Sequence, residues 1–176
     1  MVYPRVTFDK RSSRRLYIYA IVAVIIIVIA GYAYYLTIPK SPTFIAMLSK
    51  NSVVPNPTNS AATGEADFYL SSDGNTMHFV LNVNGIVNVT AAHIHLGNAT
   101  QNGPVIVPLF LGPAKTGSFS GVLAEGDITA STLAGILAGH PLSDLLADIQ
   151  VDNCYVNVHT KAFPAGEIRG QMVLGP

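Results

Sequence analysis

The sequence predicts a mainly β fold, an antiparallel β-sandwich of the Greek-key or immunoglobulin-like class, with two short helices and one transmembrane helix ahead of it. Beyond residue 43, many short segments alternate apolar with polar residues, which is the period of a strand with one buried face. Turn-forming residues separate these segments, and the strands do not alternate with long helices, a combination that favours an antiparallel sandwich. A single long apolar stretch lies near the N-terminus.

Residues 1–15 are predicted to form a basic cytoplasmic tail. They hold five basic residues against one acidic residue, a net charge of +4, whereas the remainder of the chain has a net charge of −4. No basic patch is present outside this tail, so the sequence argues against nucleic-acid binding.

Residues 16–38 are predicted to be a transmembrane helix that acts as an uncleaved signal anchor. The stretch has no charged residue, and a helix of this length spans about 35 Å, enough to cross a bilayer core of roughly 30 Å. Tyr17 and Tyr35 lie near its ends, where aromatic residues favour the membrane interfaces, and the basic tail places the N-terminus in the cytoplasm. The chain would then be a single-pass protein of the cell membrane that contacts lipid through residues 16–38, with its C-terminal domain outside.

A cleaved signal peptide is the alternative, because Gly31, Tyr32 and Ala33 offer small residues at a plausible spacing for cleavage. The apolar run is longer than the hydrophobic region of an ordinary signal peptide, which favours the anchor.

Residues 39–43 form a short linker, since Pro39 and Pro42 cannot continue a helix. Residues 44–176 are then one extracytoplasmic domain. Its strands are predicted at 44–49, 65–70, 77–84, 91–96, 105–111, 118–123, 155–160 and 166–174. The turn-forming run at 72–75 predicts that the second and third strands pair antiparallel.

Two short helices are predicted at 130–138 and 142–150. Apolar residues recur there at intervals of three and four, and the break between the helices is Gly139-His140-Pro141. Thr129 or Ser131 is expected to cap the first helix.

Three histidines are the concentrated chemistry of the chain. His93 and His95 lie two residues apart in one predicted strand, and His159 lies in another, each on the polar face of its strand. Residues at this spacing project from one face about 6.5–7 Å apart, so the pair can converge on one ion, and imidazole suits copper or zinc. His159 would supply a third ligand if its strand is adjacent.

Further polar residues on these strands are candidates for positions around such a site: Asn157, Glu167 and Arg169. The alternative is that the histidines and their polar neighbours form hydrogen bonds that organise turns and strand edges, as most buried polar groups do. Glu167 and Arg169, two residues apart, would in that case form an ordinary ion pair.

The segments that carry these residues resemble the CHRD domain family, which is named for repeats in chordin and is widespread in secreted proteins. AHIHLG at 92–97, NGPV at 102–105, YVNVHT at 155–160 and FPAGEIRGQ at 163–171 occur in the order and with the spacing of that family. The resemblance covers the chain from about Phe44 to the C-terminus and implies a β-sandwich. It implies no biochemical activity, because the family has none that is agreed.

Asn88 and Asn98 each begin an N-glycosylation sequon, and the two sequons flank the strand that holds His93 and His95. On an exported domain both are candidate glycosylation sites. Glycans at both positions would crowd the face proposed for a metal.

The leading functional hypothesis is a membrane-anchored extracytoplasmic binding or structural module, with a protein partner in a membrane or cell-surface assembly. The second hypothesis is a copper or zinc domain for storage, delivery or redox work, and the third is an accessory subunit of a membrane enzyme. The sequence contains no nucleophile elbow, phosphate-binding loop or metalloprotease motif, so it gives no support to an enzyme.

Overall fold

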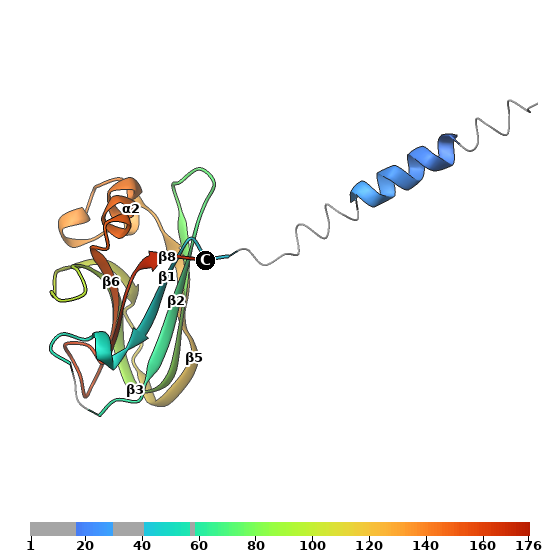
Figure 1. Cartoon of the computed structure of the whole chain (residues 1–176). Helices are drawn as coiled ribbons and strands as arrows, with labels where there is room; N and C mark the ends of the chain where they lie inside the picture. Colours follow the sequence, from blue (N-terminus) through green and yellow to red (C-terminus); the bar gives the residue numbers. More distant parts are fainter. Residues whose placement is uncertain (1–16, 30–40, 57–58) are drawn as a thin grey trace, which may run out of the picture. The chain divides into compact units, whose positions relative to one another are not determined.

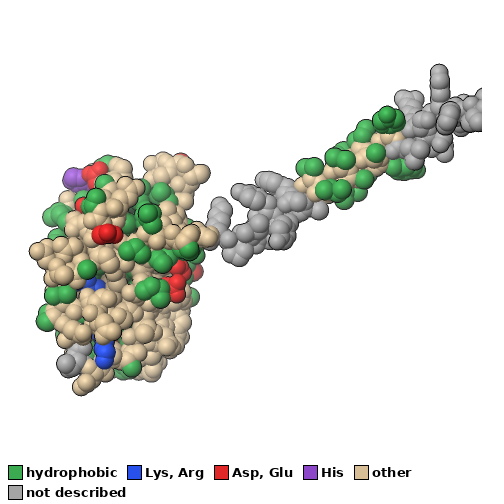
Figure 2. Space-filling view, viewed as in Figure 1, with side chains coloured by type: hydrophobic (Ala, Val, Ile, Leu, Met, Phe, Trp, Pro, Cys, Tyr) green, Lys and Arg blue, Asp and Glu red, His purple; other side chains and the backbone are tan. Residues whose placement is uncertain are grey.

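The computed structural model describes residues 17–29, 41–56 and 59–176. The chain divides into two compact units, residues 1–40 and 41–176, which are considered separately. In the first unit residues 17–29 are helical, and their large apolar side chains are exposed around the helix (Figure 2). No helix among the described residues is both long and apolar enough to cross a membrane. The rest of the predicted span, residues 16 and 30–38, lies outside the described part, as do the basic tail and the first residues of the linker.

The second unit is the folded domain, and strands are its main secondary structure (Figure 1). The strands are β1 (Phe44–Ser49), β2 (Thr63–Leu70), β3 (Met77–Leu96), β4 (Val105–Phe110), β5 (Lys115–Ile128), β6 (Cys154–Thr160), β7 (Ile168–Gln171) and β8 (Val173–Leu174). The helical elements are α2 (Leu142–Gln150) and three short 3₁₀ turns, η1 (Lys50–Ser52), η2 (Ala130–Thr132) and η3 (Gly135–Leu137). The predicted mainly β class is therefore confirmed.

All eight strands belong to one antiparallel sheet. Strands β3, β2, β1, β7 and β6 pair in that order, and β6 pairs again with β3, so five strands close into a barrel. Strands β4 and β5 add to β3, and β8 adds to β1. The expected sandwich of two separate sheets is not confirmed, because the sheet closes on itself. The antiparallel pairing predicted for the second and third strands is confirmed.

The closure depends on β3, which the sequence pattern divided into two strands at 77–84 and 91–96. The first half of β3 pairs with β2, and the second half pairs with β6. Between them Gly85 and Asn88 have positive φ angles of 66° and 56°, and the register with β5 shifts at both places. Such irregularities bend a strand and increase its twist, so one continuous strand serves two parts of the barrel.

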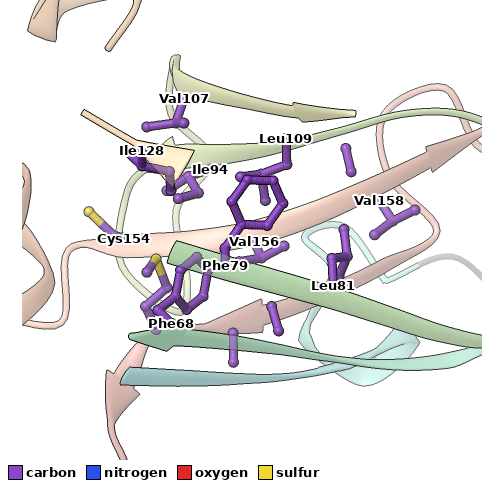
Figure 3. Close-up of a cluster of buried hydrophobic side chains, with 14 of the residues drawn as sticks. Phe68, Phe79, Leu81, Ile94, Val107, Leu109, Ile128, Cys154, Val156 and Val158 are labelled. Carbon is purple, nitrogen blue, oxygen red and sulfur yellow. The ribbon is translucent and has the colours of Figure 1, made fainter. Parts of the chain in front are cut away.

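The barrel interior is a contiguous apolar core (Figure 3). Alternate residues of β3, including Leu81 and Ile94, meet Phe68 of β2 and Val156 of β6, and all four side chains are fully buried. Cys154 lies in the same cluster, as the alternation of its strand predicts. Burial and desolvation raise the pKa of its thiol to about 12, with the negative charge of Asp148 adding to the effect, so this cysteine is an inert core residue.

Of the two predicted helices, 142–150 is confirmed as α2, which buries Leu142, Leu145 and Ile149. The predicted helix at 130–138 is instead two separate 3₁₀ turns, η2 and η3. Gly135 has a φ of +56°, a left-handed conformation that interrupts a helix, and its Cα lies so close to the carbonyl of Val105 that a Cβ would meet that oxygen at 2.4 Å. Close packing of Gly135 against β4 thus prevents the helix that the local sequence pattern predicts.

Candidate metal centre

The polar residues of three neighbouring strands line up on the outer face of the barrel. Opposite each other in the register are His93 and Asn157, and His95 and Tyr155. The next strand, β7, continues these two rows with Arg169 and Gln171. The intervening residues, Ile94 and Val156 among them, point into the core, so strand alternation alone sorts the two faces.

This register brings the three predicted histidines together. One ring nitrogen from each of His93, His95 and His159 lies within 4.8 Å of the others. The ring centroids are 5.7 Å apart for His93 and His95, 5.1 Å for His93 and His159, and 5.8 Å for His95 and His159. His95 is 9% exposed, and the other two rings are half-buried.

Two of the rings are oriented by backbone carbonyls in adjacent turns. Nδ1 of His95 donates to the carbonyl oxygen of Gly103 at 3.0 Å, and Nδ1 of His159 donates to the carbonyl oxygen of Pro164 at 2.9 Å. Because a carbonyl only accepts, Nδ1 carries the proton in both rings, and Nε2 keeps its lone pair. This second hydrogen bond is the arrangement that fixes the tautomer of metal-binding histidines.

Three buried ring nitrogens of the cluster have no hydrogen-bond partner: Nδ1 of His93 and Nε2 of His95 and of His159. A buried nitrogen without a partner is costly, and native structures rarely leave one without a reason. In the cluster each histidine contributes one such atom. These nitrogens are therefore the candidate ligand atoms.

The cluster favours neutral imidazoles. Burial, with repulsion from His159 and His95, lowers the pKa of His93 to about 4. Burial also lowers the pKa of His95, assisted by His159 and Arg169 and opposed by the hydrogen bond to Gly103. The pKa of His159 is lowered by burial, opposed by its bond to Pro164. At neutral pH all three rings are in the form that binds metal ions.

Arg169, predicted to lie around the site, is only 1% exposed and is held by a loop and a ring. Its guanidinium donates to Oδ1 of Asn102 at 2.9 Å and to the carbonyl oxygens of Asn98 and Gln101. It also lies 3.4 Å from the ring centroid of Tyr155, and that ring stacks on His95 at 5.0 Å with an interplanar angle of 9°. Tyr155 therefore contacts both Arg169 and His95 with its ring.

The other two predicted neighbours differ in position. Asn157 lies opposite His93, is buried, and donates to the carbonyl oxygen of Ala165. Glu167 instead accepts hydrogen bonds from the hydroxyls of Ser60 and Thr160, at 2.7 and 2.6 Å, and ties two loops together. The expected ion pair between Glu167 and Arg169 is not formed, because each side chain is satisfied by other groups.

The sequence reasoning missed the loop at 97–103, which supplies the contacts of Arg169 and the carbonyl that orients His95. Its glycines were the available signal. A Cβ on Gly103 would meet the carbonyl oxygen of Leu96 at 1.6 Å, and one on Gly97 would meet that of Gln101 at 2.8 Å. Such close approaches admit only glycine, so this loop is packed against the end of β3.

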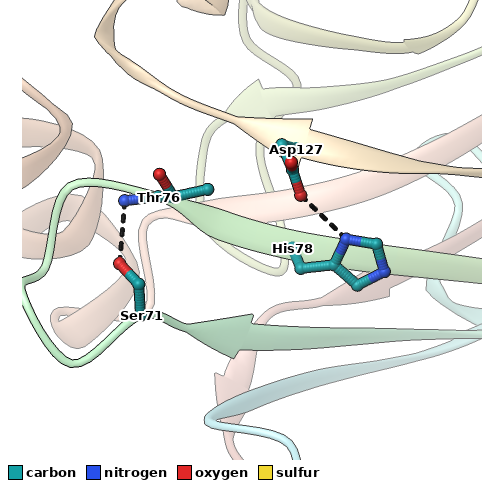
Figure 4. Close-up of polar contacts among 4 residues, drawn as sticks. All are labelled: Ser71, Thr76, His78 and Asp127. Atoms are coloured by element: carbon teal, nitrogen blue, oxygen red, sulfur yellow. Dashed lines mark hydrogen bonds and ion pairs between the residues drawn. The ribbon is translucent and has the colours of Figure 1, made fainter.

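The remaining histidines lie apart from the cluster. His78 pairs with Asp127 at 2.8 Å on the surface of β3 and β5 (Figure 4), and His140 pairs with Asp144 at 2.7 Å. Exposed pairs of this kind contribute little to stability and build no site.

The two sequons differ in accessibility. Asn98 is exposed, and its Oδ1 accepts hydrogen bonds from the backbone and hydroxyl of Thr100. Asn88 is half-buried within β3, and its Oδ1 accepts from the backbone of Gly117. The carbonyl of Asn98 also binds Arg169, which places this sequon on the loop beside the histidine cluster.

Comparison with known proteins identifies residues 44–172 as a CHRD domain. No curated protein and no solved structure matches the chain significantly. The matched region covers β1 to the residue after β7, and it includes all three clustered histidines.

Proposed function

The chain belongs to the CHRD domain family, a kind of extracellular binding or structural module, and from this premise we propose that its domain binds a copper or zinc ion through His93, His95 and His159. The observation that carries the proposal is the histidine cluster, in which one ring nitrogen of each residue lies within 4.8 Å of the others and each ring has a buried nitrogen without a hydrogen-bond partner. The opposite nitrogens of two rings are held by carbonyls. The bound ion would supply a storage, delivery or redox function at the membrane surface.

The geometry fits such an ion after a small adjustment. Nitrogen ligands about 2.0–2.1 Å from a tetrahedral ion lie about 3.3 Å from one another. The nitrogens of the cluster lie within 4.8 Å, so an inward movement of less than about 1 Å by each ring would complete the site. All three rings project from paired strands, which are rigid supports for a site.

A purely structural role for the histidines explains less. The hydrogen bonds to Gly103 and Pro164 hold two turns, as that alternative requires. They use one nitrogen of His95 and one of His159, and they give no role to the three nitrogens that lack partners. A bound metal ion explains both the nitrogens that are held by carbonyls and the nitrogens that lack partners.

The test is the metal content of the full chain, purified without an affinity tag and dialysed against a low concentration of copper or zinc. We expect close to one equivalent of metal in the wild type and none in His93→Ala/His95→Ala. The matched control is His78→Ala/His140→Ala, which also removes two histidines but leaves the cluster intact.

Two results would contradict the proposal. One is a wild-type chain that retains neither zinc nor copper after dialysis, with copper supplied both with and without ascorbate. The other is a His93→Ala/His95→Ala variant that keeps as much metal as the control while remaining folded.

We also propose that residues 16–38 anchor the domain outside the cell membrane, with the N-terminus in the cytoplasm. The uncharged composition of this stretch and the exposed apolar side chains of its described helical residues support the proposal. We expect the chain to stay in the membrane fraction after an alkaline wash and protease added outside intact cells to remove the domain. Release of the chain by the wash would contradict the anchor.

A further inference from the structure

The charge around the histidine cluster is unusual because it is positive and uncompensated. Arg169 is almost fully buried, yet its guanidinium donates to two carbonyls and an amide oxygen and to no carboxylate. Two ion pairs, His78 with Asp127 and His140 with Asp144, join an exposed histidine to an aspartate, and neither includes Arg169. The acidic residue nearest to Arg169 in the sequence is Glu167, just before β7, and it is bound to two hydroxyls instead.

A buried cation is expensive to maintain, and it is commonly paired with an anion. Arg169 is stabilised by its three acceptors and by the face of Tyr155, which attracts a cation through its π electrons. These contacts use three of its N–H donors but leave its full charge in place. The guanidinium and the His95 ring both stack on Tyr155, so the ring of a single residue joins this charge to the cluster.

The cluster itself adds no negative charge. Its ligands are three neutral imidazoles, and the group of metal-binding side chains found among residues 17–29, 41–56 and 59–176 includes no carboxylate and no thiolate. A divalent ion would therefore introduce two positive charges beside a third that no anion offsets. A monovalent ion introduces one, and in a partly buried site this difference is poorly screened.

We propose that Arg169 sets the ion preference of the cluster, and that its charge favours monovalent copper, Cu(I), over divalent copper and zinc. The inference rests on the proposed metal site. The number of ligands supports the same choice, since three nitrogens complete a trigonal Cu(I) site. Zinc takes four ligands and divalent copper favours a square-planar or tetragonal set, so each would need at least a fourth ligand beyond the three histidines, such as the water of a catalytic zinc site.

The test compares Cu(I), Cu(II) and Zn(II) affinities of the full chain by competition with chelators of known affinity, with ascorbate under anaerobic conditions for Cu(I). In the wild type we expect copper to be retained against an equal concentration of zinc under reducing conditions. Removing the charge by Arg169→Gln should shift the ratio of Cu(II) to Cu(I) affinity toward Cu(II) by about three- to tenfold. A tenfold shift lowers the one-electron potential by about 59 mV.

Two further variants separate charge from structure. Asn102→Asp keeps the oxygen that accepts from Arg169 and converts it to a carboxylate, so it neutralises the cation without removing it. We expect it to shift the ratio in the same direction as Arg169→Gln. Arg169→Lys keeps the charge but loses the forked hydrogen bonds to the loop, and we expect the wild-type ratio.

The outcomes distinguish this inference from the metal site on which it rests. A wild-type chain that binds none of the three ions overturns the metal site itself. A wild-type chain that binds zinc in preference to Cu(I) leaves the site standing and overturns the inference. So does an unchanged ratio in folded Asn102→Asp or Arg169→Gln, or a shift in Arg169→Lys as large as in Arg169→Gln.

Discussion

Burial of ionisable side chains gives individual residues of the outer face a measurable role in stability. The pKa of His93 in the folded chain is about 4, below its ordinary value of 6.5, so the folded state resists protonation. Between these two values the unfolded chain binds a proton at this residue and the folded chain does not. The free energy of unfolding must therefore fall as the pH is lowered from about 6.5 to about 4.

We predict that His93→Ala lowers the difference in bound protons between the unfolded and the folded chain by close to one in this pH window. The free energy of unfolding should then depend less steeply on pH. Urea denaturation of metal-free protein at a series of pH values in this window measures the effect, as the slope of the free energy of unfolding against pH. His78→Ala is the control, since it removes an exposed histidine that lies outside the cluster. Equal slopes for the wild type and His93→Ala would contradict the assigned pKa.

At the scale of elements, two glycines in the segment between β5 and α2 test why the predicted helix at 130–138 does not form. Gly135 and Gly139 both have left-handed backbone conformations, with φ of +56° and +82°. A Cβ at Gly139 meets nothing within 4 Å, whereas one at Gly135 meets the carbonyl of Val105 at 2.4 Å. An alanine is strained at either position, but only Gly135→Ala also requires β4 to move.

We predict that Gly139→Ala destabilises the domain by about 1 kcal/mol, the strain of a left-handed alanine, and that Gly135→Ala destabilises it by clearly more. Thermal or chemical unfolding of the two variants beside the wild type gives both values. If Gly135→Ala cost no more than Gly139→Ala, the close packing of η3 on β4 would not be the reason for the break.

For the whole molecule, a metal ion that bridges β3 and β6 would bind the folded domain and not the unfolded chain. At a free ion concentration 100 times the Kd, this linkage adds about 2.7 kcal/mol to the free energy of unfolding. For a domain of this size we expect Tm to rise by roughly 10 °C. Calorimetry with and without the ion measures the shift, and excess chelator should reverse it. The same shift in His93→Ala/His95→Ala would show that the ion binds elsewhere.

Much of this domain was predictable because its strands follow local rules. Alternation placed the apolar residues of β3 and β6 inside and the histidines outside, and it predicted β1 with its observed bounds, Phe44–Ser49. The three histidines were named from residue type and face alone. The uncharged stretch at 16–38 and the basic residues before it are likewise properties of the sequence, and the anchor they indicate stays a prediction.

Only the tertiary structure decided which strands are neighbours, because pairing between distant segments is not encoded in the period of either one. The pairing of β3 with β6 brings His159 to His93 and His95, and the bend in β3 turns two expected sheets into one closed barrel. Packing also overrode local pattern at Gly135, and it exchanged the expected partner of Arg169 for a loop and the ring of Tyr155. Residue type thus determined which groups are available, and long-range packing determined which of them meet.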